Sequence, residues 1–204
     1  MGRGRERKRN RTRHRGGVDM NKIQDIELGL FREGLFPESP KQLELVSISA
    51  HLASKLNDAW HSRLPYIHPS NITRNRNYIC FATMFDWRYF STAIWSSPVN
   101  QSFNMDSVLE LRRLAISPES PKFTATWMLS KMIKDIQKKI PRITRLISYQ
   151  DTAVHTGTIY KAANWENKST VKYRAWDKSR ERNKPQSESD KIRWEYLLNN
   201  KGLR

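Results

Sequence analysis

The sequence predicts an α/β domain in which helices flank a mixed central sheet. Strand-like and helix-like stretches alternate in the order β-α-β-β-β-α-β-α-β. Within residues 108–149 a helical stretch separates two strand-like stretches, and such a crossover makes its two strands parallel neighbours. Seven Trp, seven Tyr and seven Phe among 204 residues indicate an aromatic-rich core rather than a disordered chain.

The first elements follow from the spacing of apolar residues. Residues 21–36 have near-helical spacing and predict a short helix, whereas residues 43–48 alternate like a half-buried strand. Ser49 is a suitable N-cap for a helix that extends through His61. Residues 64–76 are polar and contain proline, so we expect a loop there.

Apolar, β-branched and aromatic stretches predict the centre of the sheet. Residues 77–85 and 89–95 suggest a hairpin with Asp86-Trp87-Arg88 between them, and residues 108–116 predict a further strand. The later elements are a helix over 124–140, a strand over 144–149, a short helix from 155 or 156 to 163, a last strand over 170–176, a polar linker over 183–189 and an amphipathic helix over 190–200.

A formal net charge of +17 favours a polyanion as the partner. Each Lys or Arg that neutralises a phosphate releases a condensed counterion, so nucleic acid suits this charge. An anionic membrane surface would attract the chain too, but no apolar stretch is long enough to span a bilayer.

Residues 1–20 form a basic arm that we expect to be disordered until it meets phosphate. Its arginines occupy every odd position of one stretch and are predicted to bind DNA: Arg3, Arg5, Arg7, Arg9, Arg11, Arg13 and Arg15. The alternative is an extension that precedes a true start at Met20. A second basic segment, interleaved with aromatic rings that can stack on bases, supplies Lys172, Arg174, Arg180 and Arg182. Its alternative is a solvated strand edge and a linker.

Cys80 is the only cysteine, which excludes a disulfide framework or a cysteine zinc site within one chain. It lies in an apolar stretch and is expected to be a small buried side chain rather than a nucleophile. The start of the chain is basic but lacks the apolar segment of a secretory signal, so a reducing cytosol is the expected compartment.

The start of the 124–140 helix is a candidate anion site. Free backbone N–H groups and the helix dipole attract anions there, and Lys122, Thr124 and Thr126 would add donors. Ordinary helix capping is the alternative.

Two adjacent arginines lie in the preceding strand. Successive strand residues point to opposite faces of a sheet, so either Arg112 or Arg113 should face inward or into a cleft. A guanidinium in such a place needs an anionic partner, and a charged donor molecule would supply one.

Residues 148–165 contain the best candidates for chemistry. Four polar side chains lie within twelve residues at the carboxyl end of a strand, where open α/β sheets bind ligands: Tyr149, Asp151, His155 and Tyr160. An Asp beside a His can set its tautomer and raise its basicity, which suits a general base. Gly157 permits a close approach of the backbone. The alternative is a polar loop with a capping Asp and a core Tyr.

His61 lies at the end of the 49–61 helix. An imidazolium suits a helix C-terminus, and that alone would explain the residue. Alternatively, His61, Asp151 and His155 would bind a metal such as iron through two imidazoles and a carboxylate.

Residues 109–115 and 146–165, with support from 60–65, resemble the phage Mom DNA-modification proteins, which belong to the GNAT superfamily of acetyltransferases. The resemblance implies an acetyltransferase sheet whose central strands splay to seat donor and acceptor. It also implies a phage or prophage protein that adds a carbamoylmethyl-type group to the N6 amino group of adenine in DNA. That adduct blocks restriction in the cytoplasm of the bacterial host.

The resemblance and the residue patterns together define the expected site. The target adenine leaves the base stack, and the catalytic candidates are Asp151, His155, Tyr149, Tyr160 and His61. The donor is expected at Arg112, Arg113, Lys122, Thr124 and Thr126. Acyl-CoA-using relatives normally carry a Gly-rich pyrophosphate loop, which residues 122–126 lack, so the donor is acyl-CoA-like or another activated group.

The expected organisation is the arm over 1–20, a GNAT-like catalytic domain over 21–182, and a linker with a C-terminal helix over 183–204. Two other functions stay open. A conventional acyl-CoA-dependent N-acetyltransferase would use this fold on a protein or a small amine. A non-catalytic nucleic-acid-binding protein would use the fold without its chemistry.

Overall fold

The computed structural model describes residues 36–61, 64–173 and 189–198. These residues form one seven-stranded sheet in the order β1-β2-β3-β4-β5-β7-β6. Neighbouring strands are antiparallel except β4 and β5, which are parallel. The strands are β1 (Glu44–Ser47), β2 (Tyr78–Phe85), β3 (Arg88–Ser96), β4 (Val108–Ile116), β5 (Arg145–Asp151), β6 (Glu166–Val171) and β7 (Lys191–Leu197). The predicted mixed sheet and its parallel crossover are confirmed.

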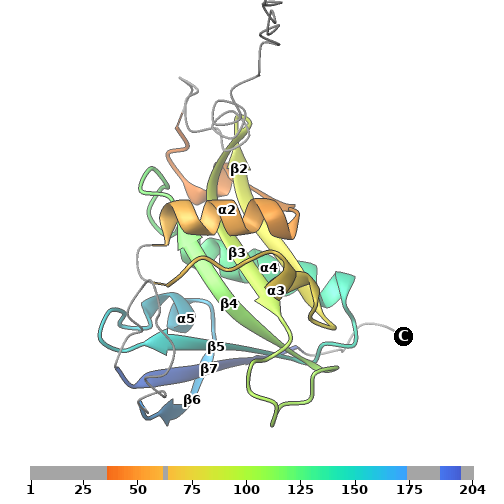
Figure 1. Ribbon diagram of the computed structural model, residues 1–204. Coiled ribbons are helices and arrows are strands. Elements are labelled where there is room, and N and C mark those ends of the chain that lie inside the picture. Colours follow the sequence, from red (N-terminus) through yellow and green to blue (C-terminus); the bar gives the residue numbers. More distant parts are fainter. Residues whose placement is uncertain (1–35, 62–63, 174–188, 199–204) are drawn as a thin grey trace, which may run out of the picture.

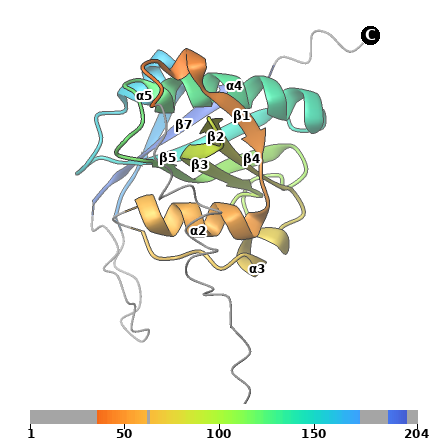
Figure 2. The same cartoon turned by 90° about the horizontal axis from the view of Figure 1, so that it is seen from above.

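Helices cover both faces of the sheet (Figures 1 and 2). Helix α2 (Ala50–Trp60) and the short α3 (Ser70–Thr73) lie on one face, and α4 (Thr124–Lys139) and α5 (Thr158–Ala162) lie on the other. A 3-10 helix, η1 (Pro40–Gln42), precedes β1. Helix α2 begins as the sequence predicts, because the Ser49 hydroxyl accepts a hydrogen bond from the Leu52 N–H at 3.2 Å.

The β2–β3 hairpin turns at Asp86 and Trp87, which have φ values of 47° and 62°. Two successive left-handed residues match the twist of the flanking strands, and Phe85 pairs with Arg88 across the turn. The Trp87 ring is 75% exposed at the tip. The predicted hairpin is therefore confirmed.

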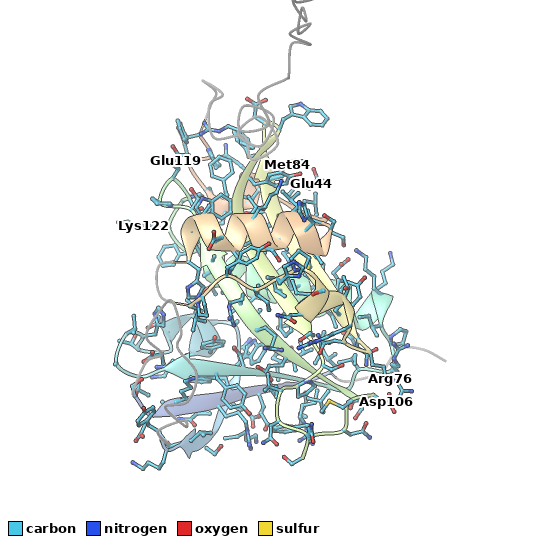
Figure 3. All side chains as sticks on the ribbon, viewed as in Figure 1. Glu44, Arg76, Met84, Asp106, Glu119 and Lys122 are labelled. Carbon is cyan, nitrogen blue, oxygen red and sulfur yellow. The ribbon has the colours of Figure 1, made fainter. Side chains whose placement is uncertain are left out.

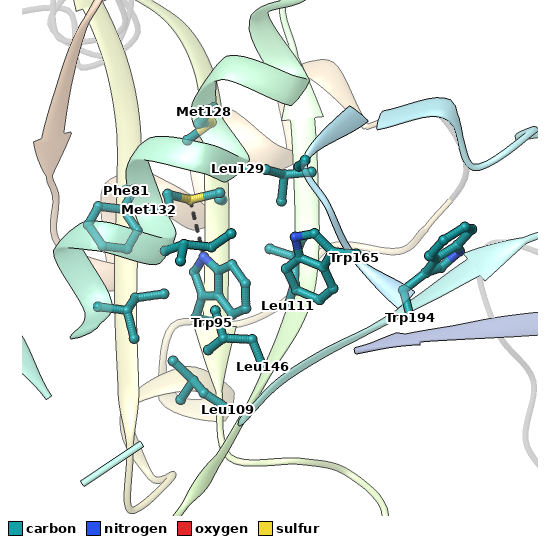
Figure 4. Packing of buried hydrophobic residues seen from close by; sticks show 14 of the residues in the cluster. Phe81, Trp95, Leu109, Leu111, Met128, Leu129, Met132, Leu146, Trp165 and Trp194 are labelled. Atoms are coloured by element: carbon teal, nitrogen blue, oxygen red, sulfur yellow. Dashed lines mark hydrogen bonds between the residues drawn. The ribbon is translucent and has the colours of Figure 1, made fainter. Parts of the chain in front are cut away.

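The main core fills the space between the sheet and α4 (Figure 4). Met128, Met132 and Ile136 face the sheet from α4, as the helical spacing of that segment predicts. The Trp95 indole N–H donates to the Met132 sulfur at 3.2 Å. A smaller cluster on the α2 face contains Cys80, and burial raises the pKa of its thiol to about 12. The expectation of a buried cysteine is confirmed.

The end of the chain differs from the prediction. The expected last strand over 170–176 is β6, which begins earlier, at Glu166, and is not the last. The predicted helix over 190–200 is wrong, because β7 occupies this segment and pairs with β5 on one side and β6 on the other. Ile192, Trp194 and Tyr196 alternate with polar residues, and this two-residue period suits a strand hydrogen-bonded on both edges.

Some expectations fall on segments that the structure does not describe. The basic arm over 1–20, the helix over 21–36 except its last residue and the linker over 183–189 except Ser189 lie outside the described residues. The predicted loop over 64–76 contains the single helical turn of α3. Figure 3 shows the side chains of the described residues on this fold.

Candidate active site

Strands β4 and β5 separate halfway along their length. Their parallel ladder runs from the Val108–Arg145 pair to the Leu111–Ser148 pair and ends there, although β4 continues to Ile116 and β5 to Asp151. A bulge accompanies the separation. On the β3 side, Ile94 pairs with Arg113 and Trp95 with Leu111, which leaves Arg112 as the extra residue of β4.

A cavity of about 690 Å³ occupies the space between the separated strands. We call it the splay cavity. Its walls are the ends of β4 and β5, the loop and helix that follow β5, and the segment after α2. Lining residues include His61, Leu64, Leu111, Arg112, Arg113, Leu114, Ala125, Ser148, Tyr149, Gln150, Asp151, Val154, His155, Gly157, Ile159, Tyr160 and Lys191. All five predicted catalytic residues and both predicted donor arginines therefore meet at one cavity.

Arg112 and Arg113 both line the splay cavity, whereas the sequence predicted a place in a cleft for only one of them. The bulge breaks the two-residue alternation on which that prediction depended. Arg112 donates to the Ser96 hydroxyl at 3.3 Å, and its Nε lies 3.5 Å from the Glu110 carboxylate. Arg113 donates to the Arg112 carbonyl at 2.7 Å.

Arg113 has fewer polar partners than Arg112. Its Nε atom is buried and has no hydrogen-bond partner in the described structure. Burial, and then the charge of Arg112, lower the pKa of Arg113 to about 10, while Glu110 acts in the opposite direction. Burial also raises the pKa of Glu110, against the Val99 N–H and the neighbouring cations. An anion in the splay cavity would offset the positive charge of Arg112 and Arg113, which both line it.

Asp151 begins the loop after β5. Its carboxylate accepts hydrogen bonds from the Ala153 N–H at 3.0 Å and from the Ser189 hydroxyl. Its carbonyl accepts from the His155 N–H at 3.0 Å, which closes the turn. The carboxylate thus stabilises the loop as a capping residue does, and the His155 side chain, which is exposed, reaches the cavity from the same turn.

Gly157 anchors this loop against the sheet. The Gln150 side chain accepts from the Trp194 indole at 2.7 Å and donates to the His155 carbonyl. A Cβ at Gly157 would lie 2.5 Å from the Gln150 Oε1 atom and 2.6 Å from the Trp194 ring. The glycine also has a φ of 77°. The predicted close approach of the backbone is confirmed, and its partners are Gln150 and Trp194.

Tyr160 is a core residue that borders the cavity. Its ring stacks on Trp194 with centroids 5.4 Å apart, and its hydroxyl lies 2.8 Å from the Ser148 hydroxyl. Burial raises the pKa of Tyr160. Burial and then the charge of Glu110 raise the pKa of Tyr149 as well. Both phenols are therefore neutral hydrogen-bond donors at neutral pH.

The turn before α4 contributes less to the cavity than the sequence suggests. Thr124 is buried, and its hydroxyl donates to the Pro121 carbonyl at 2.7 Å. Only Ala125 of residues 122–126 lines the splay cavity; Lys122 and Thr126 lie outside its walls. Phe123 precedes the helix in the left-handed conformation, with φ 68°. The donor role of Lys122, Thr124 and Thr126 stays a prediction.

His61 ends α2, and its Nδ1 atom accepts from the Leu64 N–H at 3.3 Å. Across the described part of the chain, no group of three or more His, Cys, Asp or Glu side chains is close enough to hold a metal ion. His61, Asp151 and His155 share the cavity without forming such a group, so the structure does not support iron.

Sequence reasoning missed two parts of the site. Gln150 and Lys191 line the cavity, and Trp194 packs beneath it. Lys191 and Trp194 belong to β7, which the sequence suggested was a helix. The alternation of Ile192, Trp194 and Tyr196 with polar residues was the signal that could have placed them. Of the predicted DNA-binding residues, Lys172 is exposed and pairs with Asp190 at 2.7 Å. The others, Arg174, Arg180, Arg182 and the arginines of the arm, lie outside the described residues.

Comparison with known families gives a match over most of this region. The pattern of the Mom protein family matches residues 82–203, which include β3 to β7 and nearly all of the splay cavity. The chain belongs to the Mom protein family. No curated protein matches the chain.

Several solved structures similar to this Mom family member are acetyltransferases. An N-acetyltransferase from Staphylococcus aureus Mu50 matches with a TM-score of 0.58 and 10% identity, over 78% of this chain and 99% of that one. The ribosomal-protein-S18-alanine N-acetyltransferase from Escherichia coli matches with a TM-score of 0.56 and 10% identity, over 79% and 99%. Spermidine N-acetyltransferase from Vibrio cholerae, in complex with CoA and spermine, matches with a TM-score of 0.55 and 11% identity, over 77% and 96%. The expected GNAT fold is confirmed. No helix among the described residues is long and apolar enough to cross a membrane.

Proposed function

We propose that this Mom family member is a DNA-modifying transferase that adds a carbamoylmethyl-type group to the N6 amino group of adenine and so protects phage DNA from host restriction. One observation carries the proposal. The Mom family match spans the elements that build the splay cavity, and that cavity assembles the 148–165 residues on which the resemblance depends.

The splay cavity suits a base and a donor group. Its volume of about 690 Å³ lies within the range of small-molecule sites. Leu111, Leu114, Val154 and Ile159 supply apolar walls, while polar side chains come from β4, β7 and the loop after β5. A modifying enzyme must extrude its target base from the stack and hold it in such a pocket.

Different residues of the cavity accept a proton and donate a hydrogen bond in the proposed reaction. Attack of the N6 nitrogen on the donor carbon forms an N–C bond and releases a proton from nitrogen. His155 is the exposed imidazole that accepts this proton, and Asp151 holds the turn that presents it. The bond between the donor carbon and its leaving group breaks, and the leaving group takes the electron pair. Tyr149 keeps its phenol proton, because its pKa is raised, and donates a hydrogen bond to the negative charge on that leaving group.

Cationic side chains favour an anionic donor. Arg112, Arg113 and Lys191 line the cavity, and Arg113 has an unpartnered buried Nε atom. A similar fold, the Vibrio cholerae spermidine acetyltransferase, was solved with CoA. The turn before α4 has no glycine, yet Phe123 adopts the left-handed conformation that glycine favours. These features fit an acyl-CoA-like or other activated anionic donor, which would supply the carbon that N6 attacks.

The proposal is tested by nucleoside analysis of DNA from bacteria that express the chain. Mass spectrometry should find a new adenosine-derived nucleoside with the wild-type chain and far less of it with the Asp151→Ala chain, which loses the carboxylate that holds the His155 turn. The His155 N–H keeps its hydrogen bond to the carbonyl of residue 151, so the variant should still fold. Unmodified DNA beside well-expressed, folded wild-type protein would contradict the proposal.

A conventional acyl-CoA-dependent N-acetyltransferase is the second candidate, and the structural neighbours favour it. That enzyme would acetylate a protein or small amine without DNA. Transfer from acetyl-CoA to such an amine, with DNA left unmodified, would select it.

A further inference from the structure

A second cavity lies beside the first, on the side of the sheet where α3 packs. It has a volume of about 600 Å³ and is bordered by α3, the segment between β3 and β4, and the bulged part of β4. We call it the arginine cavity. Four arginines line it, together with amide side chains such as Asn71 and Gln101: Arg74, Arg76, Arg112 and Arg113. Figure 3 shows Arg76 beside Asp106 near the start of β4.

The charges of this cavity are unbalanced. Arg76 pairs with Asp106 at 2.7 Å, and Arg112 lies 3.5 Å from Glu110. The Arg74 side chain is exposed, and the Arg113 Nε atom is buried without a hydrogen-bond partner. Two of the four arginines thus have a carboxylate partner and the other two have no ion-pair partner among the described residues, so the excess charge is positive. Guanidinium forks bind phosphate oxygens particularly well, since they offer several N–H donors in one plane.

The arginine cavity adjoins the splay cavity, and the two share a wall. Arg112 and Arg113 line both. The segment after α2 also borders both, with Leu64 at the splay cavity and Tyr66 at the arginine cavity. The Tyr66 ring is 45% exposed. A nucleic-acid strand that lies across both cavities would therefore meet cations that bind phosphates, an aromatic ring that can stack on a base, and the loop after β5, where an extruded base would enter.

We propose that the arginine cavity holds the sugar-phosphate backbone of the DNA strand next to the target adenine, with Arg74 and Arg76 on phosphates and Arg112 and Arg113 at the point where the base turns into the splay cavity. This inference rests on the proposed function and adds to it a path for the strand. It assigns DNA contacts to residues within the fold, in addition to those predicted for the basic arm and the segment around Lys172.

Arg74 and Lys134 form a matched pair for the test. Both are exposed cations, and Lys134 lies on α4, on the opposite face of the sheet. Binding of the full chain to a fluorescent duplex oligonucleotide is measured by anisotropy over a range of salt concentrations. Arg74→Glu should raise Kd about tenfold at low salt and lower the slope of log K against log salt by about 1. Lys134→Glu changes the charge equally and should alter Kd less than about twofold, because it lies outside the phosphate path.

The outcomes separate the inference from its rivals. Equal losses for the two variants, or no loss with Arg74→Glu, would overturn it. So would weaker binding of CoA alone by Arg74→Glu with unchanged DNA binding, since the cavity would then hold donor phosphates. The nucleoside analysis fails or succeeds separately. Selective loss of DNA binding without an adenine product would keep the phosphate site and reject the proposed reaction.

Discussion

The helices that follow the two separated strands begin in the same backbone conformation but with different residues. Phe123 precedes α4 with φ 68° and ψ 6°, and Gly157 precedes α5 with φ 77° and ψ 8°. The Phe123 ring is 79% exposed, whereas a Cβ at Gly157 would meet Gln150 and Trp194 at 2.5 and 2.6 Å. Left-handed backbone alone therefore does not require glycine in this protein; close packing does.

The comparison also explains which turn carries the candidate chemistry. The turn before α5 is held against the sheet by Gly157 and Gln150, so Asp151 and His155 are kept at the splay cavity. The turn before α4 projects Phe123 outward and contributes only Ala125 to the cavity walls. A rigid turn can fix side chains for catalysis, and the packing of the α5 turn provides that rigidity.

Gly157→Ala should break the tighter turn and give the largest change. We expect a loss of about 2–5 kcal/mol in the free energy of unfolding, because left-handed backbone costs alanine about 1–2 kcal/mol and overpacking adds about 1–3 kcal/mol. Urea denaturation measures it. Lys161→Ala, an exposed change on the same helix, should stay within about 0.5 kcal/mol. Equal stability of the Gly157→Ala and wild-type chains would show that the turn is not closely packed.

His155→Gln should separate activity from stability in the same turn. The adenine product should fall about 100-fold, as loss of a general base does, while the free energy of unfolding changes by less than about 0.5 kcal/mol because the side chain is exposed. Nucleoside yield and urea denaturation of one preparation give both values. An unchanged yield would remove His155 from the mechanism.

Tyr160→Phe, at the buried end of the turn, should lower the free energy of unfolding by about 1–2 kcal/mol. The reason is that the Ser148 hydroxyl loses its partner at 2.8 Å. Adding Ser148→Ala should recover part of this loss, because no buried hydroxyl is then left unpaired. A loss in the double variant that equals the sum of the two single losses would argue against the pair.

The same phenol gives a dependence on pH. Its pKa in the folded chain is raised above the ordinary value of 10.0. The stability that the neutral phenol contributes is fully present below pH 10. It is lost as the pH rises above 10, because the phenol ionises in the unfolded chain first. As the pH is raised from neutral to above 10, the Tyr160→Phe chain should therefore lose less stability than the wild type. Parallel curves for the two chains would contradict the direction of the pKa shift.

Phe123→Gly should give the smallest change in the free energy of unfolding, and this change should be a gain. Glycine adopts φ 68° without strain, which outweighs its extra freedom in the unfolded chain, so we expect a gain of about 0.5–1 kcal/mol. Thermal and urea unfolding detect it. A loss of stability would mean that the exposed Phe123 ring makes contacts that its exposure does not suggest.

Local sequence patterns predicted most of the elements that position the site. Ser49 marked the start of α2, the Met and Ile spacing marked α4, and the strand–helix–strand order gave the parallel β4–β5 pair. These features depend on residues close in sequence, which is why they were predictable. The cluster at 148–165 was found for the same reason.

What could not be predicted depends on pairing between distant residues. The bulge at Arg112 arises from its register against Trp95, so the alternation rule failed for Arg112 and Arg113. The packing at Gly157 needs Trp194, whose strand lies between β5 and β6 although it comes last in the sequence. The arginine cavity joins α3 to β4 in the same way, and no spacing in the sequence indicates it.

The most direct test of the central claim is to find where a target adenine contacts the protein. A duplex oligonucleotide carrying a photoreactive adenine analogue is cross-linked to the full chain, and the attached peptide is identified by mass spectrometry. The account predicts a cross-link to the loop after β5, within residues 148–160, that unmodified adenine-containing DNA competes away. Efficient cross-links that leave the walls of the splay cavity unlabelled would contradict it.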